Sequence, residues 1–431
     1  MLELLIKSLL VLHNEGWKAF FCKFWDYIKH IIIERNNVMK LINERYRISL
    51  EDRIKSLEDS IRSDLKTAVV VYPLFEINST FRYRAYNLQQ IMKKSARYRV
   101  VYFFPYELEK VVKYIDGIDL IILSRIEYSK ELETAVRFAR KKAKKVLFDI
   151  DDLLFDPDKF KYLLDKLGDF TNKPEANLDA TLTIITKYYL TAKMCEGFIS
   201  TNDFLGSLME DKFKKPYRVI PNFLNEEQLS VVYGEKYSRF TIGYFSGSAT
   251  HNRDFLEAWD SILKILQKYD SIDLIVVGYM TLPKSADVFI KAKRIRTVPL
   301  TDFVNLQKLY GKVHVNIAPL ENYIFNNCKS DLKFFEPAIA ETLTCASPSY
   351  TFKKSIKDGQ TGFLCVGEQW YNAIEKIYTD SRAAKDITEA AKAYAIENYS
   401  GDKIIKQIEA CFDSFLTGLK PYEANQRLEN E

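Results

Sequence analysis

Short apolar runs of strand length alternate with longer mixed stretches over most of the chain. The first run, TAVVVYPLF, covers Thr67–Phe75, and similar runs recur as far as VHVNIAPL at Val313–Leu320. The runs in between are Tyr98–Phe104, Leu120–Ser124, Val146–Ile150, Gly197–Thr201, Tyr217–Phe223, Phe240–Ser248, Leu274–Tyr279 and Ile295–Leu300. Continuous apolar runs are typical of parallel strands buried on both faces. Their alternation with helical patterns such as Lys130–Lys142 indicates βαβ units, and therefore an α/β fold.

The chain is long for a single hydrophobic core. At 431 residues, two domains are the prior expectation. The polar stretch Asn225–Arg239 separates the strand runs into two sets, so we place a domain boundary there. We predict a helical extension at residues 1–66, a first Rossmann-like domain at 67–232, a second at 233–415 and a polar tail at 416–431.

The extension carries a different pattern. Between Trp17 and Arg35, apolar residues recur at near-helical spacing beside basic ones. The apolar set is Phe20, Phe21, Phe24, Trp25 and Ile28, and the basic set is Lys18, Lys23 and Lys29. Such a segment is typical of an amphipathic helix on a membrane surface, but the same aromatics would also pack on the globular body or on a second subunit.

A heptad-like seam follows this segment. It consists of Leu50, Ile54, Leu57 and Ile61. A seam of this length predicts either a homodimer contact or a helix that lies on its own domain.

The sequence offers no clear export or membrane-spanning signal. Glu3 and Lys7 interrupt the opening stretch MLELLIKSLLVL, and no small-residue cleavage site follows it. No later segment has about 18 uninterrupted apolar residues, the length that a spanning helix needs. We therefore expect a cytoplasmic protein, held at the inner face of the plasma membrane if the extension binds lipid.

Charge and cysteine usage narrow the function classes. The net charge of +5 is small for this length, so we expect no nucleic-acid partner. The six cysteines are scattered without C-x-x-C pairs, which indicates reduced thiols and no zinc site.

The most concentrated chemistry lies in NNCKSDLKFFE, at Asn326–Glu336, directly after the run Val313–Leu320. Ligands of open parallel sheets bind at the carboxyl ends of strands, where a helix start offers free N–H groups to an anion. Lysines here would face a phosphate and Glu336 would accept hydrogen bonds from sugar hydroxyls, which suits a nucleotide-sugar. The alternative is a helix start with solvated lysines and a glutamate that complements the helix dipole. The candidate donor residues are Asn327, Lys329, Ser330, Lys333 and Glu336.

A second candidate phosphate loop follows the run Phe240–Ser248. Its sequence, SGSATHN, has small residues that allow close backbone approach to a phosphate. The candidate donor residues in it are Gly247, Ser248, His251 and Asn252.

Two further polar clusters follow strand runs of the first set. FDIDDLLFD contains the candidate catalytic residues Asp149, Asp151 and Asp152. We rank acceptor binding or catalysis first, helix capping second and Mg²⁺ binding third for these carboxylates. FRYRAYN contains the candidate acceptor-binding residues Arg82, Arg84 and Asn87. Their position suits a phosphate or an acceptor, and the alternative is surface arginines on an ordinary helix.

An ordered series of motifs runs through the globular part of the chain. It is VYPLF, FRYRAYN, FDIDDLLFD, STNDFL, VIPNF, GYFSGSATHNRDF, VNIAPLE, FNNCKSDLKFFE and DGQTGFLC. Over about Thr67–Phe415, this order resembles the bacterial GT-B glycosyltransferases of the large retaining family that builds surface polysaccharides.

The resemblance implies two Rossmann-like domains facing a cleft. It implies that the second domain holds most of a nucleotide-diphosphate sugar, the co-substrate, that the first binds the acceptor, and that no cofactor or catalytic metal takes part. The implied reaction transfers a hexosyl or deoxyhexosyl unit, with retention, to a growing lipid-linked or protein-linked glycan. We choose Asp151 as the carboxylate that acts in catalysis or orients the acceptor.

The chain departs from this family at several positions. Cys328 stands where the family has the first glutamate of a donor-binding pair, whereas Glu336 matches the second. Glu341 and Leu343 replace a glycine and a proline, and SGSATHN lacks the usual Arg and Lys, for which Lys329 and Lys333 would substitute. These departures leave open an inactive or unusual member. The competing class is a non-catalytic GT-B partner that binds glycan and supports another transferase, and a nucleotide-sugar epimerase of the same architecture ranks third.

Overall fold

The structure is a computed structural model that describes residues 48–73, 79–160, 162, 174–247, 251–278 and 280–418. The chain divides between Ile48 and Ser49, and every element below lies in the second unit. The predicted amphipathic segment Trp17–Arg35 lies outside the described residues. None of the described helices is both long and apolar enough to cross a membrane.

The first sheet has six parallel strands in the order β2-β1-β3-β4-β5-β6. They are β1 (Lys66–Val71), β2 (Tyr98–Phe103), β3 (Leu120–Ser124), β4 (Lys145–Asp149), β5 (Gly197–Ser200) and β6 (Tyr217–Val219). Residues on both faces of β1 are buried, as the continuous apolar run predicts. This sheet confirms the predicted strands of the first set.

The second sheet also has six parallel strands, in the order β12-β11-β10-β7-β8-β9. They are β7 (Phe240–Ser246), β8 (Ile272–Gly278), β9 (Ile295–Val298), β10 (Val315–Ala318), β11 (Leu343–Ala346) and β12 (Phe363–Leu364). The first four were predicted, whereas the apolar runs did not single out β11 and β12. The α/β fold class is confirmed.

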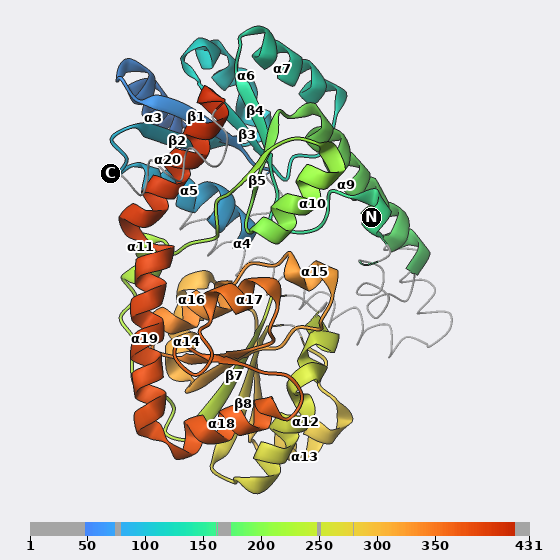
Figure 1. The fold of residues 1–431 in the computed structure, drawn as a ribbon, viewed down its shortest axis with the longest axis vertical. Helices are drawn as coiled ribbons and strands as arrows, with labels where there is room; N and C mark the ends of the chain where they lie inside the picture. Colours follow the sequence, from blue (N-terminus) through green and yellow to red (C-terminus); the bar gives the residue numbers. More distant parts are fainter. Residues whose placement is uncertain are drawn as a thin grey trace, which may run out of the picture. The chain divides into compact units, whose positions relative to one another are not determined.

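Helices cover the sheets (Figure 1). Those before β7 are α3 (Leu50–Arg62), α4 (Ser79–Phe81), the π-helix η2 (Arg82–Tyr86), α5 (Asn87–Met92), η3 (Pro105–Glu107), α6 (Leu108–Val111), η4 (Val112–Gly117), α7 (Lys130–Lys141), η5 (Pro157–Lys159), α9 (Pro174–Met194), α10 (Asp203–Phe213) and α11 (Glu226–Leu229). Those after β7 are α12 (Asn252–Lys268), η8 (Lys284–Ala286), α13 (Asp287–Lys291), α14 (Phe303–Lys312), α15 (Ile324–Asn327), α16 (Leu332–Ile339), α17 (Tyr350–Ser355), α18 (Gln369–Thr379), α19 (Ser381–Tyr399) and α20 (Gly401–Thr417).

Helix α3 belongs to the core of the first sheet. Ser49 caps its N-terminus by accepting a hydrogen bond from the Asp52 N–H, and Leu57 is fully buried in that core. The partly buried Leu50, Ile54 and Ile61 pack against the same core. The heptad-like seam is therefore the face of a helix that lies on its own domain.

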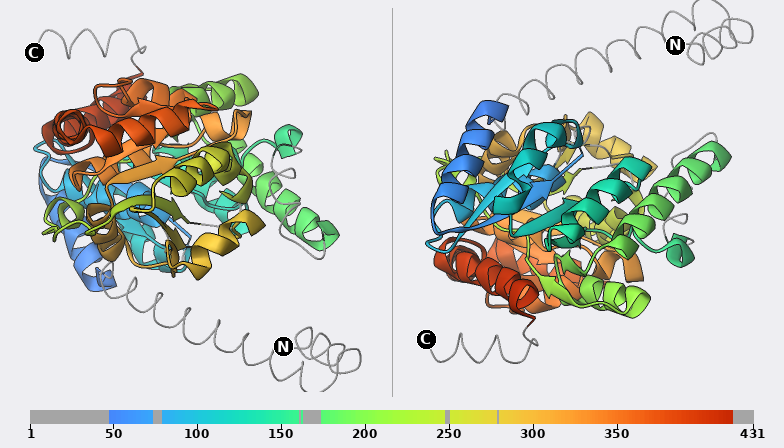
Figure 2. Two further views of the ribbon diagram at one scale, coloured as in Figure 1. Left: turned by 90° about the horizontal axis from the view of Figure 1, so that it is seen from below. Right: turned by 90° about the horizontal axis from the view of Figure 1, so that it is seen from above.

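The last helix, α20, returns to the first sheet. Figures 1 and 2 show it, in red, beside the first-sheet strands. The Phe412 ring of α20 packs edge-on against Tyr98 of β2, with ring centres 5.3 Å apart. Arg97 forms an ion pair with Asp413 at 2.7 Å. The predicted domain limits stay predictions, but the packing adds that α3, from the predicted extension, and α20, from the predicted second domain, both lie on the first sheet.

Candidate functional site

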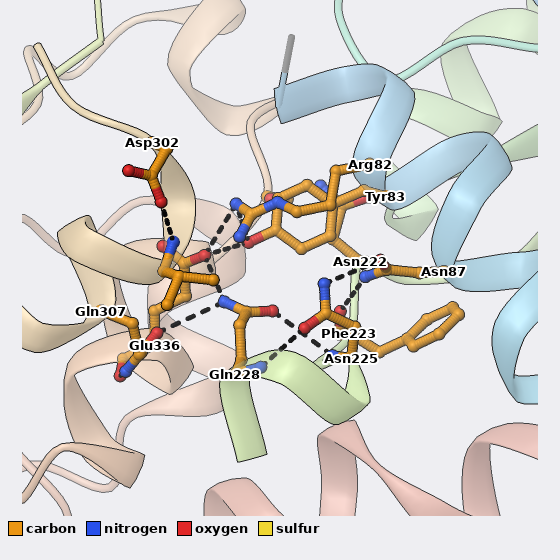
Figure 3. Close-up of polar contacts among 12 residues, drawn as sticks. Arg82, Tyr83, Asn87, Asn222, Phe223, Asn225, Gln228, Asp302, Gln307 and Glu336 are labelled. Atoms are coloured by element: carbon orange, nitrogen blue, oxygen red, sulfur yellow. Dashed lines mark hydrogen bonds and ion pairs between the residues drawn. The ribbon is translucent and has the colours of Figure 1, made fainter. Parts of the chain in front are cut away.

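The candidate site lies where the loops after the two sets of strands meet. The segment 79–87 follows β1, residues 150–152 follow β4, residues 220–225 follow β6, and residues 319–331 follow β10. Because parallel strands end at the same edge of a sheet, these loops gather at the carboxyl edges of both sheets. Hydrogen bonds join the two sets directly, and the most buried of them centre on Glu336 (Figure 3).

Glu336 lies in α16, where every residue from Phe334 to Ile339 is buried, and is only 1% exposed. Its Oε1 accepts hydrogen bonds from Arg82 Nη2 at 2.9 Å and Gln228 Nε2 at 2.8 Å, and also from the Tyr83 hydroxyl. Arg82 is itself 3% exposed, so the structure buries a charged pair between the first and second sheets. The carboxylate thus already holds partners from two other segments, which the sequence did not show.

Tyrosines surround this carboxylate. Burial raises the pKa of the Tyr83 and Tyr310 hydroxyls well above the ordinary value, and the charge of Glu336 raises both further. Gln307 adds a hydrogen bond of 2.6 Å to the Glu336 backbone oxygen. Both hydroxyls therefore stay protonated at neutral pH, and each remains a hydrogen-bond donor.

One histidine and two lysines, His251, Lys329 and Lys333, lie near the carboxyl ends of β7 and β10. His251 precedes α12, and its Nδ1 lies 2.8 Å from Asp254 Oδ2. Burial lowers the pKa of His251 to about 3, and the positive charges of Lys329 and Lys333 contribute to the same shift. The imidazole is therefore neutral at pH 7, while the two lysines supply the positive charge. Lys333 Nζ lies 5.2 Å from the centre of the Tyr244 ring.

The remaining predicted donor residues lie around this cluster. Gly247 directly follows β7, and Ser248 lies outside the described residues. Asn252 begins α12, and its Oδ1 accepts a hydrogen bond from the Thr281 N–H at 3.1 Å. Ser330 Oγ lies 3.0 Å from Asn222 Nδ2, which donates to it from the first-sheet side. The structure thus brings the predicted loops together, and their donor contacts stay predictions.

Asp149 and Arg84 form a fully buried pair. The Arg84 Nε lies 3.1 Å from Asp149 Oδ1, and Ser124 Oγ donates to Asp149 Oδ2 at 2.6 Å. Arg84 Nη1 also donates to the Ile220 carbonyl at 2.7 Å. With 0% and 1% exposure, these two side chains hold β3, β4 and the segment after β6 together. This burial argues against direct catalysis by Asp149 and direct acceptor binding by Arg84, and against the surface-arginine alternative.

Asn87 has a similar place in the interior. Its Nδ2 donates to the Phe223 carbonyl at 2.8 Å, and its Oδ1 accepts from Asn225 Nδ2 at 3.2 Å (Figure 3). The side chain is fully buried. These contacts give Asn87 a structural role, and an acceptor would reach it only after the segment 222–225 moved.

Asp151 and Asp152 share one guanidinium. Arg125 Nε donates to Asp151 Oδ1 at 2.6 Å, and Arg125 Nη2 donates to Asp152 Oδ2 at 2.7 Å. Thr80 adds a hydrogen bond of 2.9 Å to Asp151. Burial and the charge of Asp151 raise the pKa of Asp152, whereas Lys329 and Arg125 lower it. Two of the three predicted catalytic carboxylates, Asp151 and Asp152, are therefore paired with Arg125, and Asp152 lies close enough to Lys329 for its charge to act on it.

Sequence reasoning missed several residues of this site. Arg125 directly follows β3, so the rule that polar residues at strand ends face the cleft was a usable signal for it. Gln228 lies in the short helix α11, inside a stretch that the sequence marks only as a polar linker. No local pattern could have placed its amide on Glu336, 108 residues away.

No protein-family model and no curated protein sequence matches this chain. Solved structures do match. A glycosyltransferase from Rickettsia africae superposes with a TM-score of 0.56 at 13% identity, over 83% of this chain and all of that one. Anabaena HepE, in complex with UDP and glucose, superposes with a TM-score of 0.51 at 13% identity, over 80% of this chain and 99% of that one. Sucrose-phosphate synthase from Thermosynechococcus elongatus gives 0.50 at 13% identity, over 82% and 100%.

At such low identity these likenesses establish the architecture. The neighbours are GT-B glycosyltransferases, with two α/β halves of the kind seen here. The resemblance drawn from the motifs is therefore confirmed at the level of fold: this chain has the GT-B glycosyltransferase fold.

Proposed function

We propose that the protein is a glycosyltransferase that moves a sugar from a nucleotide-diphosphate sugar to a growing glycan. The observation that carries the proposal is the convergence of Lys329, Lys333 and neutral His251 at the carboxyl edge of the second sheet, beside Arg125, Asp151 and Asp152 of the first. The fold adds support, since HepE, which shares it, was crystallised with UDP-glucose.

In this proposal the second half of the chain binds the donor. Lys329 and Lys333 neutralise the charge that builds up on the departing nucleotide diphosphate. Helix α16 begins at Leu332, so its free N–H groups and dipole add positive potential at the same place. Fixed groups of this kind stabilise a leaving group without reorganising during the reaction, which favours a metal-independent transfer. The pairing of Asp151 and Asp152 with Arg125 supports the same interpretation, because Arg125 already neutralises those carboxylates.

The first half would bind the acceptor. We assign Asp151, the less exposed of the two carboxylates that pair with Arg125, to acceptor orientation. The acceptor is a lipid-linked or protein-linked glycan in this proposal, and the transferred sugar keeps its anomeric configuration. The N-terminal pattern of aromatic and basic residues favours a cytoplasmic enzyme at the inner face of the plasma membrane. A homodimer stays a proposal that the extension sequence alone supports.

The test is a panel of UDP-, GDP-, ADP- and dTDP-sugars, with binding followed by calorimetry and turnover followed by mass spectrometry. Lys329→Ala and Lys333→Ala should each weaken nucleoside-diphosphate binding about tenfold or more, since a hydrogen bond to a charged group contributes about 1.5 to 3 kcal/mol. Binding of the uncharged nucleoside should change much less. Lys291→Ala, an exposed lysine on α13, is the matched control.

Three outcomes would contradict the proposal. The first is no binding of any nucleotide-sugar in the panel. The second is equal weakening of nucleoside and diphosphate by the two lysine variants, which would remove the phosphate role. The third is complete loss of turnover with a chelator and its recovery with Mg²⁺, which would replace the metal-independent mechanism by one that uses the aspartates.

A further inference from the structure

A recess lies between helices of the two halves, beside the donor cluster, which is the group formed by Lys329, Lys333 and His251. It is a groove of about 360 Å³ between α10 on one side and α15 and α17 on the other. Its lining residues are Phe204, Asn322, Asn327, Pro348, Tyr350, Lys353 and Lys354. This volume falls in the range of small-molecule sites, and the lining combines aromatic faces with a few polar groups, as such sites do.

The aromatic wall is held from both sides. The rings of Phe204 and Tyr350 lie 5.4 Å apart between centres, at an angle of 48°. The Tyr350 N–H donates to Asn327 Oδ1 at 2.9 Å, and Lys354 Nζ lies 4.6 Å from the Tyr350 ring centre. Lys354 also forms an ion pair with Asp203 of α10 at 2.8 Å. Walls fixed in this way lose little freedom when a ligand binds.

The groove has an excess of positive charge. Its lining contains two lysines and no carboxylate, and Asp203 already neutralises Lys354. Lys353 is exposed and forms no ion pair with any residue that the structure describes. Asn322 and Asn327 add amide groups that suit hydroxyl partners. A ligand with hydroxyl groups, an apolar ring face and a negative charge would match all three features.

A backbone segment separates this groove from the donor lysines. Asn202 Nδ2 donates to the Cys328 carbonyl at 2.9 Å, and Thr351 Oγ1 donates to the Lys329 carbonyl at 2.5 Å. The charge of Lys329 nevertheless acts on the other side of this segment, where it lowers the pKa of His251 and of Asp152. The segment 327–329 therefore faces the groove through Asn327 and the donor cluster through the Lys329 side chain.

We infer that this groove binds an anionic saccharide unit of the acceptor glycan, at a distance from the unit that receives the sugar. The inference rests on the proposed function, and it adds the chemical class of the acceptor. It also gives Asn327 a place in the acceptor groove, whereas the sequence motif assigned it to the donor.

The experiment measures binding of a hyaluronan tetrasaccharide, which carries carboxylates, and of neutral cellotetraose to the full chain by calorimetry. We expect the anionic probe to bind more tightly than the neutral one. Lys353→Glu should weaken the anionic probe at least tenfold, and Tyr350→Leu should weaken both probes. Lys291→Glu, with the same charge change on exposed α13, should leave both affinities unchanged. Circular dichroism checks that each variant is folded.

The two proposals fail in different ways. Lys353→Glu should leave UDP-sugar binding and hydrolysis unchanged, because Lys353 is not part of the donor cluster. If the wild-type protein binds neither saccharide, or if Lys353→Glu binds the anionic probe as well as the wild type does, the groove inference is wrong. If Lys353-dependent saccharide binding is present but no nucleotide-sugar binds, the groove assignment stands and the transferase proposal falls.

Discussion

The side chain of Glu336 is a deeply buried carboxylate that forms an ion pair with Arg82. Arg82, Tyr83 and Gln228 all donate to the same oxygen, Oε1. The other oxygen, Oε2, is buried and accepts no hydrogen bond from the described residues, so the carboxylate depends on these three partners. A buried ion pair gives little net stability, but removing one partner leaves the other charge uncompensated. Stability should therefore be far more sensitive to single changes at this site than to a matched double change.

This sensitivity predicts the effect of Glu336→Gln. The substitution keeps the shape of the side chain but leaves the charge of Arg82 buried against a neutral amide. We expect a loss of about 3 kcal/mol in the free energy of unfolding, measured by urea denaturation. The double variant Arg82→Met, Glu336→Gln removes both charges and should recover most of that loss. The single variant Arg82→Met completes the comparison. If the losses caused by Glu336→Gln and by Arg82→Met simply add in the double variant, the two side chains are not coupled and the account is wrong.

Asp331 is a second buried carboxylate, next to the start of α16. It accepts a hydrogen bond from the Tyr399 hydroxyl, at the end of α19, and is 5% exposed. Burial raises its pKa from 3.8 to about 6, against the lowering effect of that hydrogen bond. The folded state then binds the proton more tightly than the unfolded state does. The contribution of Asp331 to the free energy of unfolding is therefore greatest below pH 3.8 and is lost as the pH rises to about 6, by about 3 kcal/mol in total.

Asp331→Asn should abolish this pH dependence. The amide oxygen still accepts the Tyr399 hydrogen bond, but no charge has to be buried at neutral pH. The free energy of unfolding of the variant minus that of the wild type should therefore be larger at pH 7 than at pH 4, by about 2 to 3 kcal/mol on the same linkage argument. Urea denaturation at the two pH values measures the difference. A difference between variant and wild type that is the same at both would contradict the assigned pKa.

At the scale of elements, the strands were the most predictable part. Parallel strands buried on both faces produce continuous apolar runs, so β1, β7, β8 and β10 could be located from the sequence. The edge strand β9 was also predicted, although two of its four residues are exposed. β12 has only two residues, and β11 lies in TLTCASP, where the apolar run is short and mixed with threonines. Such strands form because the neighbouring strand has unpaired backbone groups at its edge, and no local sequence pattern contains that information.

The site was predictable in its location but not in its contacts. Strand ends correctly indicated where Lys329, His251 and Asp151 would lie. The same rule could not tell a residue that faces open space from one that turns inward. Arg84, which follows β1, turns inward because it pairs with Asp149 at the end of β4. β4 is the second strand from β1 in the sheet, but Asp149 is 65 residues from Arg84 in the sequence.

The packing of α20 on β2 predicts that this helix unfolds together with the first sheet. The Phe412 ring is fully buried and packs on Tyr98 of β2. Phe412→Ala should cost about 3 to 5 kcal/mol, which is typical for a buried phenylalanine. If α20 belongs to the first sheet, hydrogen exchange should accelerate first in β1 and β2. Faster exchange in β8 with β1 and β2 unchanged would assign α20 to the second half instead.

At the scale of the whole molecule, the described part of the chain is tied together by its far ends. The segment that begins at Ser49 and the helix that ends at Thr417 both pack on the first sheet, although the second sheet lies between them in sequence. The two halves are further joined by the Arg82 and Glu336 pair and by the Lys354 and Asp203 pair. Changes at the interface of the halves should thus act on the unit from Ser49 as a whole.

The last prediction concerns residues 1–47, which precede this unit. Because Ser49 caps α3 and Leu57 is part of the first core, a deletion must stop before Ser49 to leave the fold intact. The sequence of the deleted part carries Lys18, Lys23 and Lys29, each of which would contribute about 1 kcal/mol of attraction to anionic lipid. We therefore expect the full chain to sediment with vesicles of phosphatidylglycerol, and a chain that begins at Ile48 to remain in the supernatant.

Vesicles of pure phosphatidylcholine serve as the control for the charge contribution, and triple replacement of those lysines by glutamine serves as the matched variant. The triple variant should lose most of its preference for anionic vesicles, since only the aromatic contacts would remain. Light scattering on the same samples measures the mass of each species. Equal sedimentation of the full and shortened chains would rule out the membrane role, and a mass that halves on shortening would mark residues 1–47 as the dimer contact instead.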